Sequence, residues 1–416
     1  MDFSKLKTVG TSNVIYYLMI VFAFALPLSR AAVSGLPALL LIVWIYKIIK
    51  EKKYIDYYKT IVHIRPLLIF IIFSLFALVS LFWSDMSGGA YKNLYKLFFY
   101  VLVLPIVMVT SLTNKEKLTV LTAFFAGMFV SEVLSYGIYF EFFETNTSRK
   151  YDYPVPFMSH IQYSTFLAVI GTLLLIKIFN SDRWKMRLFY GLYLSMVVGN
   201  LFISGGRTGQ LAFVSAVVIV SIMNFKHKVR AFIITVAILS SVLFLAYSSI
   251  DTFHNRIDRA KYDLVQVYEK QQFCTSFGVR LGSYELAYEL MKEAPIFGYG
   301  LFGHNSALYE LIDDKYPNRA CIKDHADMQN QFLLIVVQLG LFGLLLYLLF
   351  FWTLFKSVNS SSTFEKLKFV FIVVFFVFFI SEGLIYQFSN ALFGFMLALS
   401  LDSQKISHKE GRERLV

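Results

Sequence analysis

Twelve long apolar runs divide this chain, and they constrain its fold more than any other feature. A helix needs roughly 20 apolar residues to cross the hydrocarbon core of a bilayer. No segment alternates between apolar and polar residues as a transmembrane barrel strand does, so helices are the structure that satisfies the backbone in lipid. The runs span 14–28, 33–49, 67–83, 94–110, 120–140, 161–179, 188–203, 211–225, 231–247, 332–355, 367–379 and 384–401.

Composition leads to the same fold class. Hydrophobic residues make up 57% of the chain and charged residues only 16%, which is more apolar surface than one globular core can hide. The sequence therefore predicts an all-α integral membrane protein with about 12 transmembrane helices. Residues 1–249 would hold the first nine helices, 250–331 a large loop, and 332–416 the last three helices and a tail.

Basic residues set the expected orientation. Lys and Arg exceed Asp and Glu by 39 to 27, and they gather in every second short loop and in the C-terminal tail. Cytoplasmic loops of membrane proteins carry this excess, so both termini are expected in the cytoplasm and residues 250–331 on the opposite side. The charge is thus explained by topology and membrane lipids, and it does not indicate a nucleic-acid partner.

The long loop is expected to carry function, because long loops in compact proteins usually do. Apolar residues at helical spacing predict two or three helices that cap the mouth of the bundle, one of them ending near Pro295 and Gly298. Cys274 and Cys321 both lie in this loop. A disulfide and two free thiols are both compatible with the sequence, since spacing does not give Cβ distances.

Two arginines are candidates for binding an anion. Arg207 follows Gly205 and Gly206 at the outer end of the eighth apolar run, where a charge is costly unless it faces a cavity or a partner. A guanidinium binds phosphate through two parallel hydrogen bonds. An interfacial arginine that reaches lipid headgroups is the alternative. Arg280 lies on the loop, where a solvated ion pair with Glu285 or Glu289 is equally compatible with its spacing.

His325 is the candidate for proton transfer. It lies between Asp324 and Asp327, four residues before Gln329, where the chain re-enters the membrane. A neutral imidazole can orient or deprotonate a hydroxyl group, and a neighbouring carboxylate can fix its tautomer. Two arginines and one histidine suggest transfer from a phosphate-activated donor. The sequence shows no metal-ligand motif, so no metal is expected.

These motifs together resemble a known family. The segments "SGGRTG", "RIDRAKYDL", "TSFGVRLGSYELAYELMKEAPIFGYG" and "HADMQNQFLLIVVQLGLFG" occur in the order seen in the O-antigen ligase and polymerase superfamily of bacterial membrane glycosyltransferases. The detailed resemblance covers about residues 205–343. It implies a GT-C-like helical fold in the bacterial inner membrane, with one large helical periplasmic loop that carries the active site.

The resemblance also implies a reaction. Such ligases are regarded as metal-independent, cofactor-free, inverting glycosyltransferases of lipopolysaccharide biosynthesis, with undecaprenyl-pyrophosphate-linked glycan as donor and the lipid A-core saccharide as acceptor. Arg207 and Arg280 match the arginines that would hold the donor pyrophosphate, and Arg256 is a further candidate. The family's histidine position holds Gln329 in this sequence, which cannot act as a base. His325 would reach the same cavity if the helix already runs there.

Other functions are compatible with the same residues. A polymerase shares donor, chemistry and topology, whereas the single dominant late loop favours a ligase. A polysaccharide lipid transporter would need charged residues near the membrane midplane and paired broken helices. Glu132 and Glu382 are among the few acids available for it, and the sequence has no evident inverted repeat. A non-catalytic scaffold is the remaining alternative.

Overall fold

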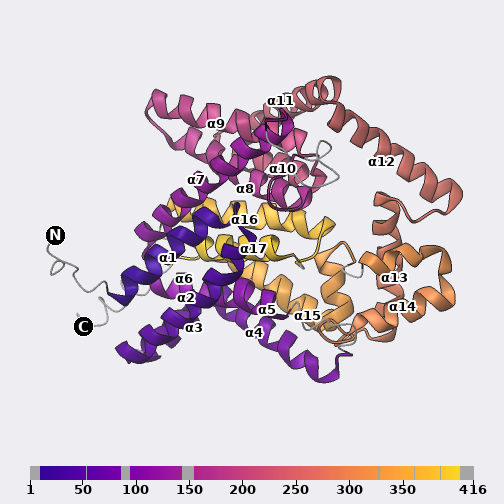
Figure 1. Ribbon diagram of the computed structural model, residues 1–416, viewed down its shortest axis with the longest axis horizontal. Coiled ribbons are helices and arrows are strands. Elements are labelled where there is room, and N and C mark those ends of the chain that lie inside the picture. The colour runs from indigo at the N-terminus through magenta and orange to yellow at the C-terminus, as the bar shows by residue number, and fades with distance from the viewer. Residues whose placement is uncertain are drawn as a thin grey trace.

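The computed structural model of the chain describes residues 10–52, 54–85, 94–142, 154–325, 328–359, 361–384 and 386–402. These residues form helices and turns and no strands, which confirms the predicted all-α class. Helices α1–α11 and α15–α17 form one bundle (Figure 1). The helices α12–α14 lie together at one end of the bundle, on the right in that view.

Nine helical segments of the described residues are long and apolar enough to cross a membrane. They are α2 (Arg30–Glu51), α4 with η2 (Arg65–Trp83), α5 with η4 and α6 (Leu94–Ser111), α7 (Asn114–Tyr139), α8 (His160–Asn180), α9 (Trp184–Ile203), α10 (Arg207–Asn224), α11 (Lys228–Ser249) and α15 (Gln331–Lys356). The chain is a multi-pass membrane protein by this measure. Each of the nine coincides with an apolar run in the sequence.

The other three apolar runs also form helices, but these do not meet the same standard for spanning. Helices α1 (Thr11–Ala25) and α17 (Gln387–Ser400) have 15 and 14 residues, which is short for a full crossing. Helix α16 (Ser362–Ser381) has 20 residues, three of which near its start are charged. Twelve transmembrane helices and the GT-C-like arrangement therefore remain predictions. A short helix that the sequence did not predict, α3 (Tyr54–His63), precedes α4.

Helix α17 forms the centre of the bundle. It is buried along nearly its whole length, and it packs against α16, α6 (Leu104–Ser111) and η4 (Leu97–Val103), a π-helical segment that follows α5 (Leu94–Lys96). Gly394 of α17 allows this approach, because a Cβ there would lie 1.9 Å from the carbonyl oxygen of Tyr100. The C-terminal helix thus fixes the positions of the helices around it, including those near the candidate site.

The described residues between α11 and α15 form three α-helices and one 3₁₀ helix, in agreement with the expected helical loop. These are α12 (Asp251–Lys270), α13 (Ser276–Glu293), α14 (His304–Lys315) and η5 (Pro317–His325). We call α12–α14 and η5 the lid. A disulfide joins Cys274, which precedes α13, to Cys321 in η5. The structure thereby settles the pairing that the sequence left open, and the bond ties the middle of the lid to its end.

Helix α15 is broken at Gly340, where φ is +67°. Residues 295–300 of the "PIFGYG" segment fill the break with four backbone hydrogen bonds of 2.8 to 3.2 Å. They run from Tyr299 N to Val337 O, Gly300 N to Gln338 O, Leu341 N to Pro295 O and Phe342 N to Ile296 O. Two of the motifs noted in the sequence therefore form one structural unit, which anchors the lid in the bundle.

Replacing Gly340 with alanine is expected to destabilise the protein. The new Cβ would lie 2.0 Å from the carbonyl oxygen of Ile296, and the positive φ is strained for any residue with a side chain. We expect a loss of about 1 to 3 kcal/mol, measured as a lower melting temperature in detergent. Gly35→Ala in α2 is the matched control, because nothing lies within 4 Å of its Cβ position. If Gly340→Ala melted at or above the wild-type temperature, the strained break would be refuted.

Candidate functional site

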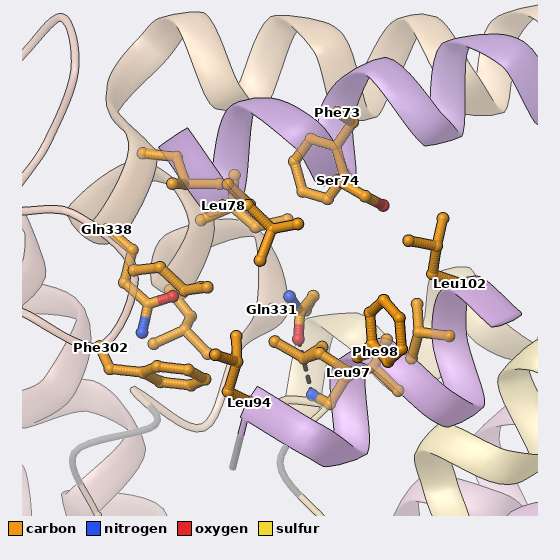
Figure 2. Close-up of a pocket in the computed structure, with 17 residues that line it drawn as sticks. Phe73, Ser74, Leu78, Leu94, Leu97, Phe98, Leu102, Phe302, Gln331 and Gln338 are labelled. Atoms are coloured by element: carbon orange, nitrogen blue, oxygen red, sulfur yellow. Dashed lines mark hydrogen bonds between the residues drawn. The ribbon is translucent and has the colours of Figure 1, made fainter. Parts of the chain in front are cut away.

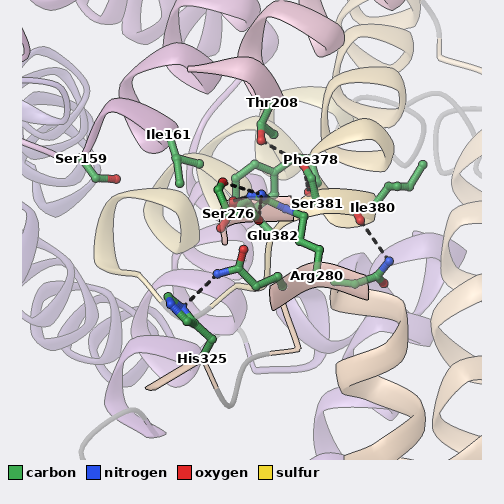
Figure 3. A network of polar contacts seen from close by, with 12 residues as sticks. Ser159, Ile161, Thr208, Ser276, Arg280, His325, Phe378, Ile380, Ser381 and Glu382 are labelled. Atoms are coloured by element: carbon green, nitrogen blue, oxygen red, sulfur yellow. Dashed lines mark hydrogen bonds and ion pairs between the residues drawn. The ribbon is translucent and has the colours of Figure 1, made fainter. Parts of the chain in front are cut away.

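The candidate site forms where α10, α13 and the C-terminal end of α16 meet (Figure 3). Thr208, the second residue of α10, shares a 3.0 Å hydrogen bond with Ser381, the last residue of α16. The next residue, Glu382, forms an ion pair with Arg280 of α13, with 3.1 Å between Oε1 and Nη2. Two motifs more than 70 residues apart thus meet at residues 380–384, which we call the 380–384 turn.

The start of α15 is attached to the same 380–384 turn. The side chain of Asn330 donates hydrogen bonds to the Ile380 carbonyl at 3.0 Å and to the Tyr284 hydroxyl at 3.3 Å. Tyr284 itself donates to the Ile380 carbonyl at 2.9 Å. The backbone N–H of Leu384 donates to Gln331 Oε1 at 2.6 Å. The start of α15 is therefore held beside the starts of α10 and α13 by polar contacts with the 380–384 turn.

Arg207 is the first residue of α10, and Gly206 is the N-cap. Gly206 and Gly209 have a packing role in the structure. A Cβ on Gly206 would lie 2.2 Å from Ser164 Oγ, and one on Gly209 would lie 2.2 Å from the Ser164 carbonyl. The glycines thus let α10 pack closely on α8, which fixes the position at which Arg207 leaves the helix.

The two arginines predicted from sequence lie close enough for their charges to interact. Arg207 is half-buried, and the charges of Arg280 and Arg259 and that of Asp263 all act on its guanidinium. Asp263 also accepts a hydrogen bond from the backbone N–H of Phe277, 3.2 Å away, at the start of α13. Bringing like charges together at a half-buried position is unfavourable unless anions compensate them, so the site is electrostatically suited to a negatively charged group.

Arg280 does not form the ion pairs that helical spacing suggested. Glu285 pairs with Arg319 at 2.7 Å, and Glu289 pairs with Lys292 at 2.8 Å. Arg280 instead reaches Glu382, 102 residues away, and also donates to the Ser276 carbonyl at 3.0 Å. Its side chain is 22% exposed and that of Glu382 only 2%, so this pair is more strongly shielded from water than a surface pair.

His325 is the last residue of η5, and Gln329 Nε2 lies 3.1 Å from its Nδ1. The condition that a helix already runs from 325 to 329 is not met, because α15 begins at Gln331 and both Met328 and Gln329 have positive φ. When the Gln329 amide donates to Nδ1, the ring carries its proton on Nε2. If the amide is reversed, Nδ1–H donates to Oε1 and Nε2 is free to accept a proton.

The structure shows fewer contacts for the remaining predicted site residues. Asp324 is exposed, and the contact that the structure gives His325 is with Gln329. Asp327 lies outside the described residues. Arg256 lies in α12, but its side chain is outside the described part of the chain. In the described residues, no three His, Cys, Asp or Glu side chains come together as a metal site, and metal independence stays a prediction.

Two residues that lie at the site, Glu382 and His160, were not predicted as site residues from the sequence. Glu382 was considered only for a transporter, and its charge at the end of an apolar run was the signal that could have identified it. His160 begins α8, and its carbonyl oxygen would lie 2.7 Å from a Cβ on Gly206, next to Arg207. A capping box formed by Ser159 and Gln162 fixes that helix start. Its serine and glutamine, spaced by three, were the sequence signal.

We expect substitutions of Arg280 and Glu382 to have strongly non-additive effects on stability, because the two residues form an ion pair. Glu382→Met would leave the half-buried guanidinium without this partner and cost about 1 to 3 kcal/mol of stability. The double variant Arg280→Met with Glu382→Met should be less destabilised than Glu382→Met alone, because no unpaired charge remains. Melting temperatures of the single and double variants measure this. Strictly additive losses would contradict the coupling, and Glu289→Met in an exposed pair is the control.

The helical membrane bundle, the cationic site and the lid define the class of this protein. It is a polytopic membrane protein that can bind an anionic ligand. Residues 192–348, from α9 to α15, match the family model described as O-antigen ligase, which confirms the resemblance based on the motifs. Residues 192–348 of this multi-pass membrane protein are thus similar to the O-antigen ligase family. The matched region includes both arginines and His325, whereas Glu382 lies beyond it.

A relative from Haemophilus influenzae is 27% identical over 222 residues and is described as an uncharacterized protein. The match covers 51% of this chain and 55% of the relative's length. The chain thus spans about half the length of this curated relative.

Proposed function

We propose that the protein is an O-antigen ligase. It would transfer glycan from undecaprenyl pyrophosphate to the lipid A-core oligosaccharide at the periplasmic face of the bacterial inner membrane. The attachment of α10 and α13 to the same 380–384 turn, through the Thr208–Ser381 hydrogen bond next to Arg207 and the Arg280–Glu382 ion pair, is the observation that carries this proposal. Two guanidinium groups provide the charge that a diphosphate needs. Both termini are proposed to lie in the cytoplasm, in line with the basic loops.

In the proposed reaction, an acceptor hydroxyl attacks the anomeric carbon of the donor sugar. The new bond from that carbon to the acceptor oxygen forms as the bond to the pyrophosphate oxygen breaks, with inversion at the carbon. Arg207 and Arg280 stabilise the negative charge on the departing undecaprenyl pyrophosphate. Glu382 is a positioning residue that holds Arg280. His325 orients the acceptor hydroxyl or accepts its proton, and Gln329 controls the tautomer.

Polymerase activity is the alternative reaction, since it uses the same donor and differs mainly in the acceptor. The lid between α11 and α15 favours a ligase, because it is the dominant segment outside the membrane-spanning helices. A deletion strain distinguishes the two. A ligase deletion should leave lipid A-core without polymer while lipid-linked polymer accumulates. A polymerase deletion should instead leave lipid A-core capped with a single repeat, and that result would refute the ligase proposal.

Transport of a glycan lipid is less well supported. Transporters use broken helices to line a substrate cavity, whereas backbone from the "PIFGYG" segment fills the break in α15. Glu132 is fully buried in α7 near Tyr163 and Tyr193 and remains an acid without a proposed role in glycan transfer. If Arg207→Ala and Arg280→Ala preserved transfer in a reconstituted assay while substrate flux fell, the enzyme proposal would have to be abandoned.

A further inference from the structure

Glu132 is a buried acid of the bundle to which the proposed reaction gives no role. It lies in α7 with 0% of its surface exposed, and it precedes Tyr139, the last residue of that helix, by about 10 Å along the axis at 1.5 Å per residue. Neither oxygen of its carboxyl group has a hydrogen-bond partner in the part of the chain that the structure describes. An isolated ionised carboxylate is very costly inside a membrane protein, so Glu132 is a candidate site for binding a positive charge.

Two polar side chains in an apolar pocket of the bundle show the contrast with Glu132. Figure 2 shows Gln331 in the lining of the pocket between α4, η4 and α15, where its Oε1 accepts a hydrogen bond from the Leu384 N–H at 2.6 Å. In the same pocket, Ser74 donates to the Phe70 carbonyl at 2.8 Å. Both side chains are satisfied by neighbouring backbone, whereas Glu132 is not.

The hydroxyl and amide groups near Glu132 are already hydrogen-bonded to other atoms. Tyr193 of α9 lies beside Glu132, and its O–H donates to the Phe125 carbonyl at 3.0 Å. Asn200 of α9 donates from Nδ2 to the Tyr163 hydroxyl of α8 at 3.0 Å. A hydroxyl has a single hydrogen, so the Tyr193 oxygen can only accept a further hydrogen bond. A proton on Glu132 would supply that bond, whereas an ionised Glu132 would bring two acceptors face to face.

The groups around Glu132 include no partner for a salt bridge. Among the described residues, the titratable groups that face it are the hydroxyls of Tyr193 from α9, Tyr163 from α8 and Tyr136 from α7 itself. Helix α1, which also packs on α7, contains no charged residue. Without a guanidinium or ammonium group beside it, a buried carboxyl group is stable when it carries a proton.

We propose that Glu132 is a proton-binding site inside the bundle, where it holds one proton as a neutral carboxylic acid that donates to the Tyr193 oxygen. Tyr163, Asn200 and Ser135 form a hydrogen-bonded chain beside it, since Ser135 donates to Asn200 Oδ1 at 2.8 Å. Tyr163 lies in the first turn of α8, and Asn200 lies in the last turn of α9. The chain therefore leads from Glu132 toward the helix ends near the lid and gives the proton a route to that side.

The proton site adjoins the start of α10. Ser164 follows Tyr163 in α8, and Gly206 and Gly209 pack against it. A negative charge at Glu132 would draw water into the contact between α7 and α8, whereas the bound proton keeps this contact dry. The proton thus helps to hold α8 in the position that supports the first arginine of α10. Proton binding would hold equally for a ligase, a polymerase or a transporter, so its test needs no enzymatic activity.

Labelling of the purified full-length protein with dicyclohexylcarbodiimide tests the proposal. This apolar reagent adds to a protonated carboxyl group: the acid proton moves to one nitrogen, the carboxyl oxygen bonds to the central carbon, and the adduct rearranges to a stable N-acylurea. Glu382 is the internal control, because it is also buried but is ionised in its pair with Arg280. At neutral pH we expect Glu132 to be labelled about tenfold more than Glu382 or better, because an unpaired buried acid stays neutral. Mass spectrometry of the peptides measures both sites.

Infrared spectroscopy is the second measurement, and it does not depend on access of the reagent. The wild type should show the carbonyl band of a neutral carboxylic acid, and Glu132→Gln, which keeps the size of the side chain but has no acid proton, should lose it. Equal labelling of Glu132 and Glu382 would overturn the proposal, and so would identical infrared spectra of the wild type and Glu132→Gln. If Na⁺ in place of choline in the buffer suppressed the labelling of Glu132, the site would bind a metal cation and the proton proposal would be wrong.

Discussion

Replacing Arg280 with alanine should reduce glycan transfer by about 100- to 1,000-fold, the range found when one preorganised donor to a developing negative charge is removed. The guanidinium is held toward the site by Glu382 and lies within reach of the charge on Arg207. Arg280→Lys should recover only part of the rate, because an ammonium group keeps the charge and loses the paired hydrogen bonds. Initial rates with purified donor and acceptor measure the effect.

Lys292→Ala is the matched control for this prediction. Lys292 lies on the same helix, but it is exposed and pairs with Glu289 on the helix surface. Its loss should change the rate by less than about twofold, because exposed ion pairs contribute little. Arg207→Ala should resemble Arg280→Ala. If both arginine variants remained folded and transferred glycan at the wild-type rate, Arg207 and Arg280 would have no role in holding the pyrophosphate.

Replacing His325 with alanine is expected to reduce transfer by about 100-fold or more, the usual contribution of a general acid or base. The loss should appear in the maximal rate more than in donor affinity, because His325 is proposed to act on the acceptor hydroxyl. Gln329→Ala should cause a smaller loss, since it removes only the hydrogen bond to His325 Nδ1. Maximal rates at saturating acceptor, measured together with donor affinity, distinguish the two roles.

His160→Ala provides the competing test. His160 begins α8 beside Gly206 and is a second histidine near the cationic site. If its replacement abolished transfer while His325→Ala remained active, the proton-transfer role would belong to His160. If both variants remained active, catalysis would not need an imidazole, and the arginines would account for the chemistry alone.

The helices could be predicted from the sequence because each depends on local information. A run such as 231–247 must be helical in lipid wherever it lies in the bundle, and the structure has α11 (Lys228–Ser249) there. Helices in the lid were expected for a similar reason, since apolar residues in 279–290 repeat at helical spacing. Helix α3 was not predicted, because it is short and lies among basic residues assigned to a loop.

The site could be predicted only in part, because its contacts are long-range. Arg207 and Arg280 were recognised as candidates, but the pair of Arg280 with Glu382 joins residues 102 positions apart, and helical spacing suggested nearer partners. The helix that would have brought His325 to the family's histidine position is not formed, because Met328 and Gln329 adopt left-handed conformations. The break at Gly340 could not be predicted from local sequence either, because it depends on backbone hydrogen bonds with residues 295–300.

The central claim is that this protein joins a lipid-linked glycan to lipid A-core. The most direct test is a reconstituted assay with purified wild-type protein, undecaprenyl-pyrophosphate-linked O-antigen, lipid A-core and a metal chelator. We expect glycan attached to lipid A-core and one undecaprenyl pyrophosphate released for each glycan transferred, with no loss of rate from chelation. Lengthening of the lipid-linked glycan, with lipid A-core left unmodified, would contradict the account.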